Sequence, residues 1–126
     1  MSNSNSINGK LQCFSLTGLD GKTTGSTLIF TPTSRFTPLM VTFEATAITA
    51  LISVSSCSIG SNGASYNDIL AISPLTGVIV VNNVLSFPLS ALSNSIAAGT
   101  GIYINVTTGA VGTTYTIKST LTGFYD

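Results

Sequence analysis

The sequence predicts an all-β protein, a single antiparallel β-sandwich of about eight strands closed as a jelly roll or a related Greek key. From about residue 10 onward the chain is dense in Thr, Val, Ile, Phe and Tyr, the residues that favour strands. Turn-forming residues interrupt these runs at intervals of about ten residues, and helix signals are weak throughout. The length of 126 residues suits one domain and not two.

The first half of the chain contains four predicted strands. They cover residues 11–17, 26–31, 39–46 and 50–59. The Asp20-Gly21 pair that follows the first run suits a tight turn. Pro32 and Pro38 cannot donate hydrogen bonds to a strand ladder, so we expect a loop or a sheet edge before the third strand.

Two apolar stripes in this half are expected to be buried in the core. Side chains two residues apart point to the same face of a strand. One stripe contains Leu39, Val41 and Phe43, and the other contains Ile52 and Val54. Burial in the subunit's own core is the default for both stripes, and either one is also a candidate contact between subunits.

The second half of the chain contains five further runs with strand character. They cover residues 68–72, 78–81, 84–87, 101–108 and 114–122. The last two runs show the clearest alternation of apolar and polar residues, and the short glycine-containing segment between them predicts a hairpin. Residues 88–98 carry Leu89, Leu92 and Ile96 at helical spacing and are the one candidate for a short turn or helix.

The chain is predicted to consist of an N-terminal arm and one folded domain. Residues 1–9 are mostly Ser and Asn, which cannot bury enough apolar surface to become ordered, so the sandwich is expected to span residues 10–126. This segment also lacks the basic and apolar regions of a secretory signal. Synthesis in the cytoplasm would keep Cys13 and Cys57 reduced, although the sequence leaves open whether they pair.

The charge content excludes some classes of partner. Four Lys or Arg balance four Asp or Glu, so only 6% of the chain is charged, against about 25% in an average soluble domain. Lys10, Lys22, Arg35 and Lys118 are scattered along the sequence, which argues against a nucleic-acid partner. No stretch approaches 18 uninterrupted apolar residues, so no membrane partner is expected.

The residue types argue against an enzyme. The chain has no His, which removes the usual base for a nucleophilic serine and most zinc sites. The spacing of Asp20, Glu44, Asp68 and Asp126 indicates no carboxylate pair of the kind that glycosidases use. We therefore expect no catalytic residue, no cofactor-binding residue, no metal-binding residue and no cofactor.

Other short motifs have ordinary structural interpretations. Residues 18–23 end like a phosphate-binding loop, but only two residues separate the glycines, so a turn is expected. Asn67 and Asp68 supply too few oxygens for calcium. The sequon at Asn105 lies in a predicted strand. Tyr103 and Tyr115 are expected to be neighbours across the last hairpin, where they would form a structural pair or part of a glycan platform.

The sparse charge favours extensive protein contacts. A surface that owes its polarity to Ser, Thr, Asn and peptide groups can be desolvated without stranding ions. An unusually neutral monomer is the alternative. The composition therefore predicts that the chain functions within an assembly.

The last quarter of the chain resembles a family of viral proteins. The residues that carry the resemblance are 98–110 (AGTGIYINVTTGA), 112–117 (GTTYTI) and 123–125 (GFY). They resemble the C-terminal hairpin of small structural proteins of tailed bacteriophages, the capsid cement or decoration proteins. Upstream the likeness consists of strand pattern, low charge and the Ser58–Gly60 turn followed by residues 66–70.

The resemblance implies a structural virion protein, a cement or decoration subunit that stabilises the phage head by bridging neighbouring capsomers. It implies a trimeric β-sandwich on the capsid surface, in contact with the major capsid protein and assembled in the bacterial host cytoplasm. The alternative is a phage tail or baseplate accessory protein, or a glycan-binding β-sandwich module. An exposed aromatic cluster would favour that alternative.

Overall fold

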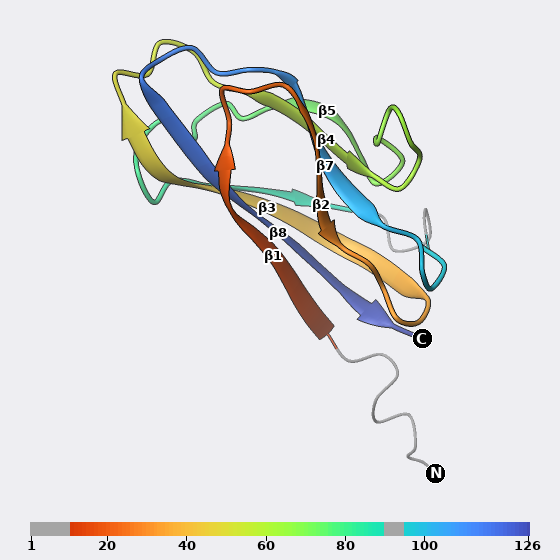
Figure 1. The fold of residues 1–126 in the computed structure, drawn as a ribbon. Helices are drawn as coiled ribbons and strands as arrows, with labels where there is room; N and C mark the ends of the chain where they lie inside the picture. Colours follow the sequence, from red (N-terminus) through yellow and green to blue (C-terminus); the bar gives the residue numbers. More distant parts are fainter. Residues whose placement is uncertain (1–10, 90–94) are drawn as a thin grey trace.

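The computed structural model describes residues 11–89 and 95–126, which form a sandwich of two antiparallel sheets (Figure 1). The strands are β1 (Leu11–Asp20), β2 (Gly25–Phe30), β3 (Phe36–Thr49), β4 (Ser56–Gly60), β5 (Leu70–Pro74), β6 (Val84–Pro88), β7 (Ile102–Thr108) and β8 (Thr114–Tyr125). No helix occurs in these two ranges. The prediction of an all-β sandwich with about eight strands is confirmed.

The order of the strands is that of a jelly roll. Sheet A has the order β1-β8-β3-β6, and sheet B has the order β2-β7-β4-β5. The first strand therefore pairs with the last, the second with the seventh, the third with the sixth and the fourth with the fifth. This is a long antiparallel ribbon wrapped into two sheets, which is one of the two closures that the sequence predicts.

The predicted hairpin between the last two strands is wrong. β7 lies in sheet B between β2 and β4, whereas β8 lies in sheet A between β1 and β3. The alternation itself is confirmed, because Ile102, Ile104 and Val106 are buried. In β8 Tyr115, Ile117, Ser119 and Leu121 are buried in the same way. Alternation identifies the buried face of a strand but does not identify the neighbouring strand.

Two predicted strands are shorter than expected or absent. The run at residues 50–59 becomes a strand only from Ser56 onward, and Ile52, which we expected in the core, is 80% exposed. The run at 78–81 forms no strand, since the Val78 amide donates to the Leu75 carbonyl in a turn. Both segments lie where the ribbon passes between the sheets, so they have no neighbouring strand.

Three other boundaries also differ from the predictions. β5 begins at Leu70, two residues later than expected. Pro32 lies in the loop between β2 and β3 as predicted, whereas Pro38 lies inside β3 opposite Gly123. A register irregularity follows Pro38 and accommodates its missing backbone N–H donor. Pro88 ends β6, and Ile96 forms a bridge to Phe36, so the ends of the predicted helix at 88–98 are extended. The middle of that segment, residues 90–94, and the predicted arm at residues 1–9 lie outside the described residues.

The core fills the space between the two sheets. The inward faces of β3 and β8 contribute from sheet A, and those of β4 and β7 contribute from sheet B. The largest fully buried side chains are Tyr115, Phe36, Phe43, Ile59, Leu75, Ile102, Ile104, Ile117 and Leu121. The stripe of Val41 and Phe43 is therefore in the core as predicted, and Leu39 next to it is half-buried.

Candidate interaction surfaces

One end of the sandwich exposes a group of large apolar side chains, which we call the apolar end. Its members are Ile52, Ile79, Val80, Val81 and Val111, whose exposed fractions run from 41% to 80%. They come from the β3–β4, β5–β6 and β7–β8 connections, at the end away from the C-terminus of β8 (Figure 1). Large apolar side chains exposed together at one end of a domain are typical of a contact site.

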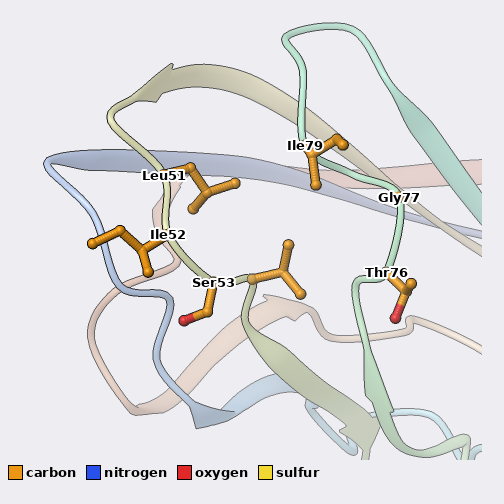
Figure 2. A pocket seen from close by; sticks show the side chains of 7 residues that line it. Leu51, Ile52, Ser53, Thr76, Gly77 and Ile79 are labelled. Carbon is orange, nitrogen blue, oxygen red and sulfur yellow. The ribbon is translucent and has the colours of Figure 1, made fainter.

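A hollow of about 540 Å³ opens at the apolar end. Figure 2 shows Leu51 and Ile52 on one side of it and Thr76, Gly77 and Ile79 on the other. Four of the seven residues that line the hollow are aliphatic, and among the described residues no charged side chain lines it. The hollow can therefore receive an apolar side chain without desolvating an ion.

Hydrogen bonds hold the connections of the apolar end in place. The Ile52 amide donates to the Val111 carbonyl at 2.7 Å, and the Val111 amide donates to Ser53 at 3.0 Å. The Tyr115 hydroxyl, which is buried, donates to the Val78 carbonyl at 2.7 Å and ties the β5–β6 connection to the core. The exposed side chains are thus presented by a fixed backbone, which lowers the entropic cost of forming a contact.

The outer face of sheet A carries a row of hydroxyl groups across all four strands. Ser15 and Thr120 share a hydrogen bond at 2.9 Å, and Thr42 and Ser86 share one at 3.3 Å. Thr120 and Thr42 are direct partners in the register, so the row is continuous. In the next row Glu44 and Lys118 are cross-strand neighbours. This face is polar but almost uncharged.

The outer face of sheet B carries two tyrosines whose rings are in contact. The rings of Tyr66 and Tyr103 have centroids 4.7 Å apart and an interplanar angle of 37°. The predicted pairing of Tyr103 with Tyr115 is wrong, because Tyr115 points into the core from the other sheet. Tyr125 lies elsewhere, with its ring centroid 5.6 Å from that of Phe36.

The acidic residues have structural partners. The Asp20 carboxylate accepts hydrogen bonds from the Lys22 amide and the Thr23 hydroxyl, both at 2.9 Å, and these bonds lower the pKa of Asp20. The predicted turn at this position is therefore confirmed. Asp68 accepts from the Ser61 amide at 2.6 Å and from the Ser61 hydroxyl at 2.7 Å, so it closes the loop after β4. Within residues 11–89 and 95–126, no three His, Cys, Asp or Glu side chains gather as metal ligands.

Both cysteines are free thiols in different sheets. Cys13 is exposed on β1, and its sulfur lies 3.5 Å from the Thr122 hydroxyl. Cys57 is buried on β4, and burial raises the pKa of its thiol to about 12. The Asn105 sequon lies within β7, as expected. In the part of the chain that the structure describes, no helix is long and apolar enough to cross a membrane.

None of the three surfaces follows from the local sequence. The pattern predicts a strand at residues 78–81, although three consecutive apolar residues at 79–81 between turn residues also fit an exposed connection. The hydroxyl row needs the register of four strands, and the Tyr66–Tyr103 contact needs a loop folded onto a sheet. Neither arrangement leaves a signal in local sequence.

Comparisons with known proteins give matches at the level of structure only. No protein-family model matches the sequence, and no curated protein matches it. A chain in the capsid asymmetric unit of cyanophage Pam1 is similar in fold, with a TM-score of 0.58 and 14% identity over 100% of this chain and 92% of that one.

Two further solved structures resemble the chain. A chain in the acid-stable capsid of Helicobacter pylori bacteriophage KHP30 has a TM-score of 0.60 and 12% identity over 94% of this chain and 90% of that one. A chain in the capsid of Ralstonia phage GP4 has a TM-score of 0.58 and 12% identity over 100% and 90%. Coverage is nearly complete in both directions, so the matched chains are similar in length to this one.

Proposed function

We propose that the chain is a structural virion protein, a capsid cement or decoration subunit that stabilises a phage head by bridging neighbouring capsomers. The observation that carries this proposal is the fold match over nearly the whole chain to chains from three phage capsids. The proposed partner is the major capsid protein, and the proposed location is the outer surface of the virion.

The chemistry of the surface supports this role. The sequence has no charged residue between Asp68 and Lys118, a stretch that includes most of the apolar end. Docking such a surface desolvates few ions, and the isoleucines and valines supply the favourable free energy. We propose that the apolar end contacts the major capsid protein, with an apolar side chain of that protein in the hollow.

The subunit is further proposed to be a homotrimer, as the resemblance to cement proteins implies. Residues 1–9 would extend the contact with the capsid by becoming ordered upon binding. No nucleic acid or membrane takes part in the proposal. Light scattering on a sizing column checks the trimer, and a monomer that persists at tens of micromolar would contradict assembly before docking.

Binding to capsids that lack the protein tests the proposed role. The wild-type chain should bind undecorated capsids of the virus that encodes it and should raise their disruption temperature. Replacing Ile52 and Val111 with Asp should abolish binding, since two charges would be buried without partners. Ile72→Asp is the control, because Ile72 is 59% exposed on β5 and outside the apolar end. Density for the protein on the tail and not on the head would contradict the proposal.

The proposed arm can be tested separately. Deleting residues 2–8 should weaken capsid binding and should leave the melting temperature of the isolated protein almost unchanged, because these residues precede β1. Unchanged capsid affinity would reject docking by the arm and would leave the rest of the proposal standing.

A further inference from the structure

The Tyr66–Tyr103 pair belongs to a patch of aromatic and apolar side chains on the outer face of sheet B. Leu28 lies opposite Tyr103 in the register of β2 and β7 and is 42% exposed. Gly101 lies beside both side chains, and a Cβ there would come within 2.9 Å of Leu28 and 3.1 Å of Tyr103. The patch therefore consists of two aromatic rings and one leucine, and Gly101 leaves space beside Leu28 and Tyr103.

The loop after β4 holds Tyr66 on this patch. The Tyr66 backbone has a φ of +47°, a conformation that is unfavourable for a large side chain. The Tyr66 amide donates to the Asn62 carbonyl at 2.7 Å, and the Asn62 side-chain oxygen accepts from the Asn67 amide at 2.8 Å. A network of hydrogen bonds thus maintains a strained position for one aromatic ring, an arrangement that is frequent at binding sites.

The loop also requires room on the sheet beneath it. A Cβ on Gly60 would collide with Asp68 and with the backbone of Tyr66 and Asn67. The hydroxyl of Ser58, which is fully buried, donates to the Ser65 carbonyl under the loop at 3.3 Å. The loop is therefore packed against β4 as a fixed part of the fold.

Polar groups border the patch on two sides. Asn105 follows Tyr103 on the same face of β7, and Ser26 lies opposite Asn105 on β2. On the loop side, the Asn67 side-chain oxygen accepts from Asn62 at 2.8 Å, so the amide nitrogen of Asn67 remains to donate. Amide and hydroxyl groups therefore flank the aromatic rings.

We propose that this patch, defined by Leu28, Tyr66 and Tyr103, is a binding site for a neutral carbohydrate. A pyranose ring presents a face of C–H groups that packs against the electron-rich face of an aromatic ring. Its equatorial hydroxyls would reach Asn105 and Asn67, which donate and accept. The proposal is independent of the capsid role and would add recognition of a sugar on a cell or particle surface.

The charge pattern favours a neutral sugar over a nucleic acid, which can also stack on tyrosines. A nucleic acid needs cations along its backbone, and the sequence has no Lys or Arg between Arg35 and Lys118. That range contains β4, the loop and β7. The same absence of cations disfavours acidic polysaccharides.

The test is a binding titration of the full-length protein with neutral oligosaccharides. The probes are maltohexaose, cellohexaose, mannohexaose and chitohexaose at up to about 10 mM, followed by chemical-shift changes of the backbone amides. At least one probe should shift the amides of Tyr103 and Asn105. Tyr103→Ala should weaken that binding at least tenfold, whereas Tyr103→Phe, which retains the ring, should weaken it less than threefold.

A second variant separates binding from folding. Tyr66→Phe keeps the ring on the loop and should retain binding. Val84→Ala is the control, because Val84 is 56% exposed on β6 and lies outside both the patch and the apolar end. The melting temperatures of the variants show that the fold is intact. Absence of binding by every probe, or equal binding by wild type and Tyr103→Ala, would overturn the proposal. Loss of capsid binding in Tyr103→Ala without any sugar binding would also overturn it, because the patch would then be a protein contact.

Discussion

The two ends of the sandwich handle apolar side chains in opposite ways. At the end where β1 begins and β8 finishes, Phe14, Phe30, Phe36 and Tyr125 form an aromatic cluster. Phe14 and Phe30 are stacked with ring centroids 3.8 Å apart, and Phe36 meets Phe30 edge to face at 5.1 Å. At the apolar end, isoleucines and valines of similar hydrophobicity remain in solvent.

The difference comes from what lies opposite each side chain. The aromatic cluster draws on strands of both sheets, so Phe14 and Phe36 of sheet A both pack against Phe30 of sheet B. The apolar end is built from connections that have no second layer over them, and Ile52 consequently keeps 80% of its surface exposed. The aromatic cluster stabilises the subunit, whereas the apolar end is available for a partner.

The largest expected effect is at the aromatic cluster. Phe36→Ala removes a fully buried ring that contacts Phe14, Phe30 and Tyr125, and should lower the free energy of unfolding by about 3–5 kcal/mol. Urea denaturation measures this change. Ile79→Ala at the apolar end is the matched variant and should change the free energy of unfolding by no more than about 0.5 kcal/mol. Equal losses of stability in the two variants would refute the contrast between the two ends of the sandwich.

The second effect in order of size is expected at alkaline pH, which should destabilise the core. Burial raises the pKa of Cys57 from 9.0 to about 12 and that of Tyr115 from 10.0 to about 12. Both groups are neutral when protonated, so the stability they contribute is present below their unfolded pKa values and is lost as pH rises from 9 toward 12. At about 1.4 kcal/mol per pKa unit, the two groups together should cost several kcal/mol over this range, with Cys57 contributing more than Tyr115.

Denaturation curves between pH 8 and 12 check this expectation. The double variant Cys57→Ala with Tyr115→Phe should show a flatter dependence over the same range, because it lacks both buried acids. A wild-type midpoint that stays constant up to pH 12 would show that these groups ionise without opposing the fold.

A smaller effect is expected where the core supports the apolar end. Tyr115→Phe removes the hydrogen bond to the Val78 carbonyl and should cost about 1–2 kcal/mol. Amide exchange should accelerate mainly at Val78 and Val80, which belong to the β5–β6 connection. Uniform acceleration across both sheets would mean that the bond stabilises the whole sandwich and does not hold this connection in particular.

The smallest effect on stability is expected at the exposed side chains themselves. Ile52→Ser combined with Val111→Ser should change the free energy of unfolding by about 0.5 kcal/mol or less, since neither residue is in the core. The same variant should bind less of a hydrophobic fluorescent dye, because the exposed apolar surface becomes smaller. A large loss of stability would show that the apolar end belongs to the core of the subunit.

The sequence by itself was sufficient for the features that depend on local pattern. Alternation in β7 and β8 identified their buried faces, and the Asp20-Gly21 pair identified a turn that the structure confirms. The low content of charged residues, which is also visible in the sequence, predicted a surface with few charged side chains. These features depend on neighbours within a few residues, so a one-dimensional pattern contains them.

Only the tertiary structure decided which segments meet. β7 and β8 separate into different sheets because each strand of the wrapped ribbon pairs with a distant one, and local alternation is the same for either partner. Residues 79–81 have strand propensity but lie at an end without a neighbouring strand, so they are exposed. The contact of Tyr66 with Tyr103 spans 37 positions and exists because the loop after β4 folds onto sheet B. Burial and contact at these positions depend on long-range packing, which hydrophobic pattern alone does not specify.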